Sequence, residues 1–185
     1  MAVTLQERDT GKMSRDGRFA TRRHGAIVGA MGPIGRKTAA APTPARSRRG
    51  RSADLPALYA ILSAARENRQ FETFAGFESA AAPFIKAGLC WVLSIGPDIA
   101  GFTAVDGRAG SVEMLYVHPA QEGKTVGRAL MRRCLDDLIR LGHRSAWLVT
   151  ARDTRADRFY RAQGWIEIED LGRGSVKLTR KLSGL

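Results

Sequence analysis

The apolar residues that follow Ser52 recur at intervals typical of regular secondary structure. Either Ser52 or Asp54 can cap a first helix, whose apolar positions are Leu55, Leu58, Tyr59, Leu62 and Ala65. A second helical stretch is expected over residues 71–87. We expect it to break near Pro83, because proline lacks a backbone donor and clashes with the preceding turn.

Three short runs of strand-forming residues come next, at residues 91–95, 100–105 and 112–117. Gly96-Pro97-Asp98 separates the first two runs, and Asp106-Gly107 separates the last two. These residue types favour tight turns, so the runs predict an antiparallel meander of three strands.

The strongest helical pattern covers residues 127–141. Gly142 is expected to end it, and its apolar face consists of Leu130, Met131, Cys134, Leu135, Leu138 and Leu141. A fourth strand is expected at residues 146–150. Residues 154–157 resemble a capping box and are expected to open a short helix that ends at Gly164. A strand pair is expected at residues 165–169 and 175–178. This order of elements predicts an α/β fold without internal repeats.

The first fifty residues show no sustained apolar period and are dominated by Gly, Arg, Ser, Thr, Pro and Ala. Such a segment buries too little apolar area to offset the entropy of the chain. We therefore expect residues 1–47 to form a disordered basic tail and residues 48–185 to form one folded domain.

The net charge of +12 is concentrated in that tail. Residues 1–51 carry ten Arg and two Lys against three acidic residues, whereas the rest of the chain is nearly balanced. Three interpretations of the tail stay open. It could be a nucleic-acid-binding arm that acts through Arg46, Arg48, Arg49 and Arg51, an organelle transit peptide, or an extension without function, including a start codon set too far upstream. The acidic residues count against a transit peptide.

Other classes are excluded by what the chain lacks. No apolar run approaches the roughly 20 residues needed to cross a membrane, so we do not expect an integral membrane protein. The two cysteines, Cys90 and Cys134, lie far apart, which indicates neither a disulfide framework nor a zinc site. Two unpaired thiols fit a cytoplasmic protein, and no cluster of ligand residues predicts a metal.

Residues 122–128, Glu-Gly-Lys-Thr-Val-Gly-Arg, join a predicted strand to the strongest helix. A helix N-terminus presents unpaired N–H groups and positive potential, and therefore binds anions. Gly123 and Gly127 would let the backbone approach a phosphate, and Lys124 and Arg128 would add charge. Two cofactor classes, a nucleotide and coenzyme A (CoA), compete for this site.

A nucleotide would need a phosphate-binding P-loop. Gly123-Lys124-Thr125 matches the end of GxxxxGK[ST], but His118 stands where the pattern requires its first glycine. The strand at residues 146–150 also has no aspartate at its tip to serve magnesium, although Asp153 follows closely.

CoA would place its pyrophosphate on the same amides. With these residues the chain resembles the GNAT superfamily of acetyl-CoA-dependent N-acetyltransferases. The resemblance runs from about Ser52 to the C-terminus and is carried by SADLPAL, AGFTAVDG, VEMLYVHPAQEGKTVGRALMRRC and RFYRAQGW, in the order and spacing of the family. It implies a mixed sheet flanked by helices, with central strands that splay apart to admit the cofactor.

The resemblance also implies roles for individual residues. The backbone of Leu115, Tyr116 and Val117 would pair with the pantetheine arm and polarise the thioester carbonyl. The pyrophosphate would bind the residues Gly123, Lys124, Thr125, Val126, Gly127 and Arg128. Tyr160 matches the tyrosine that protonates the departing thiolate, and Asp153 stands where an asparagine often contacts the cofactor. Glu113, two residues before Leu115, is our candidate for the base that deprotonates the amine.

Several positions depart from the family pattern. Glu122 replaces the usual Gln or Arg, which puts a carboxylate beside the pyrophosphate, and Thr125 replaces a glycine, although its hydroxyl could donate to a phosphate. Leu148 and Val149 offer no glutamate on their strand, where many members have one. The basic run on the last helix is interpreted as solvated charge or as a contact to the CoA 3′-phosphate, and consists of Arg152, Arg155, Arg158 and Arg161.

We therefore expect a cytoplasmic enzyme that transfers an acetyl group from acetyl-CoA to a primary amine by direct attack. The alternative is a non-catalytic module of the same fold that binds CoA or a partner. The acceptor stays open among protein N-termini, lysines, polyamines, amino acids and drug amines. A homodimer formed through edge strands is common among similar proteins.

Overall fold

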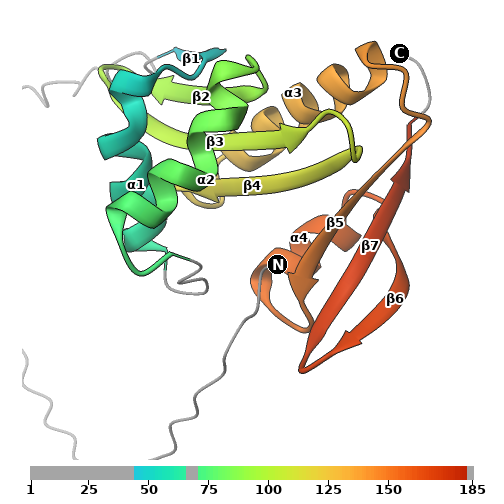
Figure 1. Ribbon diagram of the computed structural model, residues 1–185. Coiled ribbons are helices and arrows are strands. Elements are labelled where there is room, and N and C mark those ends of the chain that lie inside the picture. The colour runs from blue at the N-terminus through green and yellow to red at the C-terminus, as the bar shows by residue number, and fades with distance from the viewer. Residues whose placement is uncertain (1–43, 66–70, 183–185) are drawn as a thin grey trace, which may run out of the picture. The chain divides into compact units, whose positions relative to one another are not determined.

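The computed structural model describes residues 44–65 and 71–182 of the 185-residue chain. Within these residues the strands form one mixed seven-stranded sheet in the order β1-β2-β3-β4-β5-β7-β6 (Figure 1). The strands are β1 (Ala45–Arg49), β2 (Cys90–Ile95), β3 (Asp98–Asp106), β4 (Ser111–Val117), β5 (Ser145–Ala151), β6 (Ile166–Gly172) and β7 (Ser175–Lys181). The helices are α1 (Leu55–Ala64), α2 (Phe74–Lys86), α3 (Val126–Arg140) and α4 (Arg155–Arg161), with short 3₁₀ turns η1 (Ser52–Asp54) and η2 (Pro119–Gln121). The α/β class expected from the sequence is confirmed.

The meander β2-β3-β4 forms one half of the sheet and is antiparallel throughout, as its turn residues predicted. Helices α1 and α2 cover one face of it, and α3 packs against the other (Figure 1). The first face is built around Phe77 and Phe102, both fully buried, and the second around Leu130 of α3. The amphipathic helices thus bury both faces of the meander.

The sheet opens between β4 and β5. These strands run parallel, and in the described sheet they are joined at one residue pair, Ser111 with Trp147. β5 instead pairs along its whole length with β7. Residues 112–117 of β4 therefore have no strand partner on the β5 side of the sheet. The splayed central strands expected from the sequence are confirmed.

A β-bulge lies at the start of this opening. Val105 of β3 pairs with Val112, whereas the preceding Ala104 pairs with Met114, so Glu113 is an extra residue on β4. A bulge bends its strand and redirects the side chain of the extra residue. Glu113 is accordingly exposed between two buried neighbours.

β1 was not expected. It pairs antiparallel with β2 and begins at Ala45, so the folded domain starts earlier than the boundary we placed at residue 48. The sequence Ala-Arg-Ser-Arg-Arg has no alternation of apolar and polar residues, which is the signal for a half-buried strand. Polar contacts hold this strand in place instead.

Those contacts centre on Asp137 of α3, a carboxylate that is only 2% exposed. It accepts hydrogen bonds from Arg49 Nη2 at 2.9 Å and from Trp91 Nε1 at 2.8 Å, and it pairs with Arg140. The Arg49 guanidinium also stacks 4.0 Å from the centroid of the Trp91 ring. Arg133 donates to Ser47 of β1 at 3.0 Å. A buried carboxylate satisfied by several donors can fasten an edge strand that lacks apolar side chains.

These contacts change the interpretation of the basic tail. Arg49 is engaged with Asp137, and Arg48 forms a bidentate pair with Asp54, with both N···O distances at 2.7 Å. Two of the four arginines assigned to a nucleic-acid-binding arm thus serve the fold. The remaining expectation, a disordered tail, falls on residues 1–43, which lie outside the described residues.

Two local expectations are wrong. α2 continues through Pro83 to Lys86 instead of breaking there. The carbonyl that loses its intrahelical donor belongs to Ser79, which is exposed and can bond to water, so the loss is tolerated. Leu141 is 51% exposed, because α3 ends at Arg140 and Leu141 is its C-cap.

The cysteines lie in the core as free thiols. Burial raises the pKa of Cys90 and of Cys134 to about 12, so thiolate is scarce at neutral pH and neither residue is suited to act as a nucleophile. None of the described helices combines the length and apolar character that a membrane span requires.

Candidate active site

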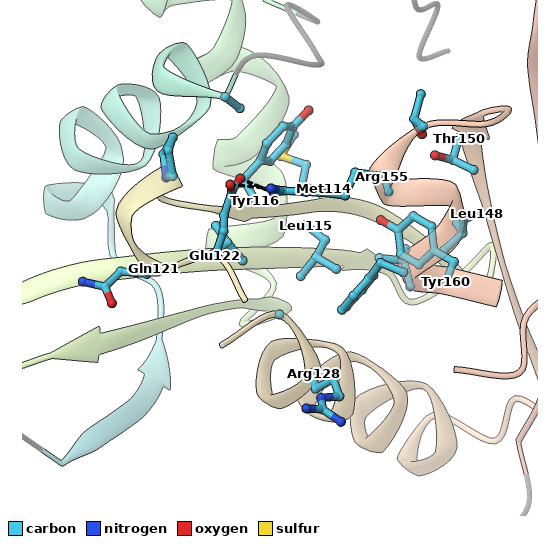
Figure 2. A pocket seen from close by; sticks show the side chains of 18 of the residues that line it. Met114, Leu115, Tyr116, Gln121, Glu122, Arg128, Leu148, Thr150, Arg155 and Tyr160 are labelled. Atoms are coloured by element: carbon cyan, nitrogen blue, oxygen red, sulfur yellow. Dashed lines mark hydrogen bonds and ion pairs between the residues drawn. The ribbon is translucent and has the colours of Figure 1, made fainter. Parts of the chain in front are cut away.

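A cleft of about 950 Å³ occupies the space where β4 and β5 separate (Figure 2). Its walls are β4, the loop that leads into α3, the carboxyl half of β5 and one face of α4. The cleft therefore exists because β5 leaves β4 after a single pair and joins β7. Side chains from segments 30 or more residues apart in the chain meet in it.

The β4 wall offers backbone groups as well as side chains. The N–H of His118 donates to Ala100 of β3 at 2.8 Å. Because backbone groups alternate sides along a strand, the N–H and C=O groups of Leu115 and Val117 point away from β3, toward the cleft. Buried backbone groups need partners, so this edge can receive an amide-bearing ligand as an added strand.

Tyr116 lines the cleft with its ring on the opposite face of β4, where it stacks on Phe102 at a centroid distance of 5.4 Å. Burial raises the pKa of its phenol to about 12. The side chain is thus a neutral part of the wall at physiological pH.

The loop after β4 is shaped by short-range hydrogen bonds. His118 Nδ1 accepts from the Ala120 N–H at 3.2 Å, and the His118 carbonyl accepts from the Gln121 N–H at 2.8 Å. Lys124 Nζ donates back to the Ala120 carbonyl and to Gln121 Oε1, both at 3.1 Å. Gly123 has a φ of +72°, which a residue with a side chain adopts only with strain. His118 therefore caps a turn, in agreement with the usual role of a polar residue before proline.

The first residues of α3 differ in what they face. Thr125 is the N-cap residue, but its hydroxyl makes no capping hydrogen bond. Val126 is buried in the core and does not line the cleft. Gly127 packs against Phe159 of α4, where an added Cβ would lie 3.2 Å from the ring. Glycine at this position thus permits α4 to approach α3 closely, in addition to any contact with a ligand.

Tyr160 projects from α4, and Figure 2 shows its hydroxyl pointing toward β4. Its ring packs edge-on against Phe159 and Trp165, with centroid distances of 5.4 and 6.0 Å. Burial is the main reason that the pKa of this phenol lies well above its ordinary value. The side chain is held firmly by its ring and remains protonated at neutral pH.

Glu113 reaches the cleft through the bulge in β4. It lines the cleft, is exposed to solvent and accepts a hydrogen bond from the hydroxyl of Ser111. A carboxylate with access to water at this position can take up a proton directly or through a water molecule.

Glu122 and Arg155 form an ion pair between the loop and the start of α4. Arg155 Nη1 donates to Glu122 Oε2 at 2.5 Å, and Nη2 contacts the other carboxylate oxygen. Both residues line the cleft, and Figure 2 draws the pair as dashed lines. The carboxylate that departs from the family pattern is therefore neutralised by an arginine from the opposite wall.

The other arginines of the basic run have different partners. Arg152 and Arg161 both bind Glu167, Arg161 also binds Asp157, and Arg158 donates to the Asp153 carbonyl at 2.8 Å. These contacts tie α4 to β6. They favour the interpretation of structural surface charge over that of a phosphate site for these three arginines.

Ten of the twelve residues predicted as site residues line the cleft: Glu113, Leu115, Tyr116, Val117, Gly123, Lys124, Thr125, Gly127, Arg128 and Tyr160. Val126 and Asp153 are outside its lining. Asp153 lies in the turn before α4 with a φ of +62°, and its N–H donates to Asp157 Oδ2.

Thr150 and Met114 also line the cleft, although neither was expected there from the sequence. The contact of Arg155 with Glu122 was also missed. It joins residues 33 positions apart, and no spacing rule connects them. In the described residues no group of three or more His, Cys, Asp and Glu side chains is arranged to hold a metal ion.

Comparison with known proteins agrees with this geometry. The model of the acetyltransferase (GNAT) family matches residues 55–165, which is more than half of the chain. No curated protein sequence matches significantly.

Solved structures match the fold. Ard1 from Thermoplasma volcanium has a TM-score of 0.66 at 17% identity and covers 76% of this chain and 99% of its own. The ribosomal-protein-S18-alanine N-acetyltransferase from Escherichia coli has a TM-score of 0.62 at 21% identity, covering 77% and 96%. A putative acetyltransferase from Salmonella typhimurium, solved with its cofactor acetyl-CoA, has a TM-score of 0.56 at 21% identity, covering 75% and 94%. At these identities the likeness establishes the fold, which confirms the architecture expected from the sequence.

Proposed function

The chain belongs to the GNAT acetyltransferase family, and from that membership we propose that it transfers an acetyl group from acetyl-CoA to a primary amine. The observation that carries the proposal is the cleft between β4 and β5, where unpaired backbone of β4 and the phenol of Tyr160 face the same space. An acyl acceptor and an extended amide-bearing donor can meet there.

The chain's own residues fit acetyl-CoA. The backbone groups of Leu115 and Val117 are available to the amides of a pantetheine arm, and the loop from Gly123 to Arg128 is available to a pyrophosphate. When bound, acetyl-CoA supplies the thioester from which the acetyl group is transferred. A β4 N–H that donates to the thioester carbonyl would stabilise the negative charge that develops there.

Tyr160 and Glu113 take the two proton transfers in this proposal. The amine nitrogen forms a bond to the acetyl carbon as the carbon–sulfur bond breaks, so the amine loses a proton and the thiolate gains one. Glu113 accepts the amine proton, directly or through water. Tyr160, protonated at neutral pH, donates to the sulfur. No covalent enzyme intermediate is required, because both substrates can occupy the cleft together.

A structural neighbour suggests one class of acceptor to test. The Escherichia coli neighbour acts, by its name, on an alanine of a ribosomal protein. Peptide amines therefore belong in the acceptor panel beside lysine, polyamines and amino acids.

The test uses the full chain with acetyl-CoA and this amine panel, and measures release of the CoA thiol. We expect a micromolar calorimetric isotherm with acetyl-CoA at 1:1 stoichiometry, no heat with ATP–magnesium, and thiol release with at least one amine. Binding without turnover on any amine would favour the non-catalytic alternative. Heat with ATP–magnesium but not with acetyl-CoA would contradict the proposal and favour a nucleotide.

A further inference from the structure

The ion pair between Glu122 and Arg155 is built like a site for a bidentate anion. Two guanidinium nitrogens of Arg155 face two carboxylate oxygens of Glu122 inside the cleft. A guanidinium presents the same fork of donors to a phosphate as to a carboxylate. Glu122 thus occupies a position that a phosphate group can take.

One of the two cations of the loop is already engaged, whereas the other, Arg128, lines the cleft. Lys124, the lysine of the loop, is turned back onto the Ala120 carbonyl and Gln121 Oε1. Glu122 precedes Gly123 and places a carboxylate where an incoming pyrophosphate would be repelled. Arg155 faces Glu122 of this loop from the other wall.

The pair can also be exchanged. The side chain of Arg155 is 55% exposed and that of Glu122 is 29% exposed. Ion pairs with this much solvent contact are weak, so a multiply charged ligand can displace the carboxylate. By contrast, Asp137, which pairs with Arg49, is only 2% exposed.

We propose that Arg155 is an exchangeable phosphate ligand that leaves its pair with Glu122 and binds the pyrophosphate of acetyl-CoA. The loop lacks the usual Gln or Arg at residue 122, and Arg155 of α4 takes over the role of that side chain. Glu122 competes with the cofactor and sets its affinity. This inference rests on the proposed function, because acetyl-CoA is the ligand that it describes.

The two residues then have opposite effects on affinity. In Glu122→Gln the guanidinium is no longer held by a carboxylate and the loop loses a negative charge, so the Kd for acetyl-CoA falls by about threefold. In Arg155→Gln the charged hydrogen bonds to the phosphate are lost, and the Kd rises by about tenfold. A pair that only braced the cleft would give weaker binding in both variants.

The experiment is calorimetric titration of the full chain and the two variants with acetyl-CoA and with S-acetylpantetheine, a thioester without phosphates. Neither substitution is expected to change the Kd for S-acetylpantetheine. Glu78→Gln and Arg132→Gln are matched controls, because they remove the same charges from exposed residues outside the cleft. Both should bind acetyl-CoA like the wild type.

Equal weakening of acetyl-CoA binding in both variants, no change in either, or equal effects on S-acetylpantetheine would each overturn the inference. Thiol release with amines, measured on the same samples, separates this result from the proposed function. Opposite shifts in Kd without any turnover would support Arg155 as the phosphate ligand and reject the acetyltransferase proposal. Absence of acetyl-CoA binding in the wild type and in Glu122→Gln would reject both.

Discussion

The surroundings of Tyr160 suit the role of proton donor that we propose for it. Its ring is wedged between Phe159 and Trp165, and no hydrogen bond within the described residues engages its hydroxyl. Burial raises its pKa, which keeps the phenol in the proton-donating form. A rigid ring with an uncommitted hydroxyl is well suited to deliver a proton in one direction.

We expect Tyr160→Phe to lower kcat by about 100-fold, because a positioned general acid contributes about that much. The Kd for acetyl-CoA should stay the same, since the ring is retained. The wild-type rate should not decline between pH 7 and 9 through loss of this proton, because the folded-state pKa lies above that window. Steady-state thiol release checks both points, with Tyr59→Phe as the control. Wild-type turnover of Tyr160→Phe across pH 7–9 would contradict the role.

Glu113 is exposed because of the bulge in β4. A variant at this position tests whether Glu113 is the base that deprotonates the amine. In Glu113→Gln, we expect kcat/KM at pH 7 to fall by about 100-fold, because the charged amine no longer has a partner to take its proton. The deficit should shrink as the pH approaches the amine pKa, about 10 for an alkylamine, where the free amine is abundant in solution. A deficit that is constant from pH 7 to pH 10 would show that Glu113 does not act as the base.

At the scale of elements, β1 is held in the sheet by side-chain contacts to α3. Its side chains are mostly arginine and serine, and two of them, Ser47 and Arg49, contact Arg133 and Asp137. Strand and helix are therefore coupled through polar groups, one of which is buried. Removal of the buried carboxylate would leave the groups that bond to it without an acceptor.

We expect Asp137→Ala to lower the free energy of unfolding by about 3 kcal/mol, because it leaves the Trp91 N–H and the Arg49 guanidinium without their acceptor. Chemical denaturation measures the change. Asp136→Ala, the neighbouring residue on the same helix, should cost less than about 0.5 kcal/mol because its side chain is not buried in this cluster. Similar losses in the two variants would contradict the role of the buried carboxylate.

At the scale of the molecule, β1 is the first element of the fold within the described residues. A chain of residues 44–185 should unfold at the temperature of the full chain, because the sequence predicts no core in the preceding segment. A chain of residues 50–185 lacks β1 and the Arg49 contact to Asp137, and its Tm should fall by about 10 °C. Differential scanning calorimetry compares the three. Equal Tm values for all of them would show that β1 contributes nothing to stability.

The predictability of the elements followed the strength of their local signals. α3 was predicted closely because its apolar face repeats over four turns, and the meander because its turn residues stand between apolar strands. β1 escaped notice because its partners lie 40 to 90 residues away in the chain and its own pattern is polar. The break expected at Pro83 was wrong because solvent can bond to the carbonyl that proline leaves without a donor, and packing can support a helix that propensity alone would end.

The predictability of the site also depended on whether the signal was local in the sequence. The sequence alone predicted a phosphate-binding loop at residues 123–128 and a role for Tyr160, because each lies in a contiguous motif whose spacing carries the information, and both stay predictions. Only the tertiary structure decided that β5 leaves β4 and opens the cleft, that a bulge turns Glu113 into it, and that Arg155 neutralises Glu122. Each of these depends on contacts between segments distant in the chain, whose energies are set by the three-dimensional packing and leave no periodic trace in the sequence.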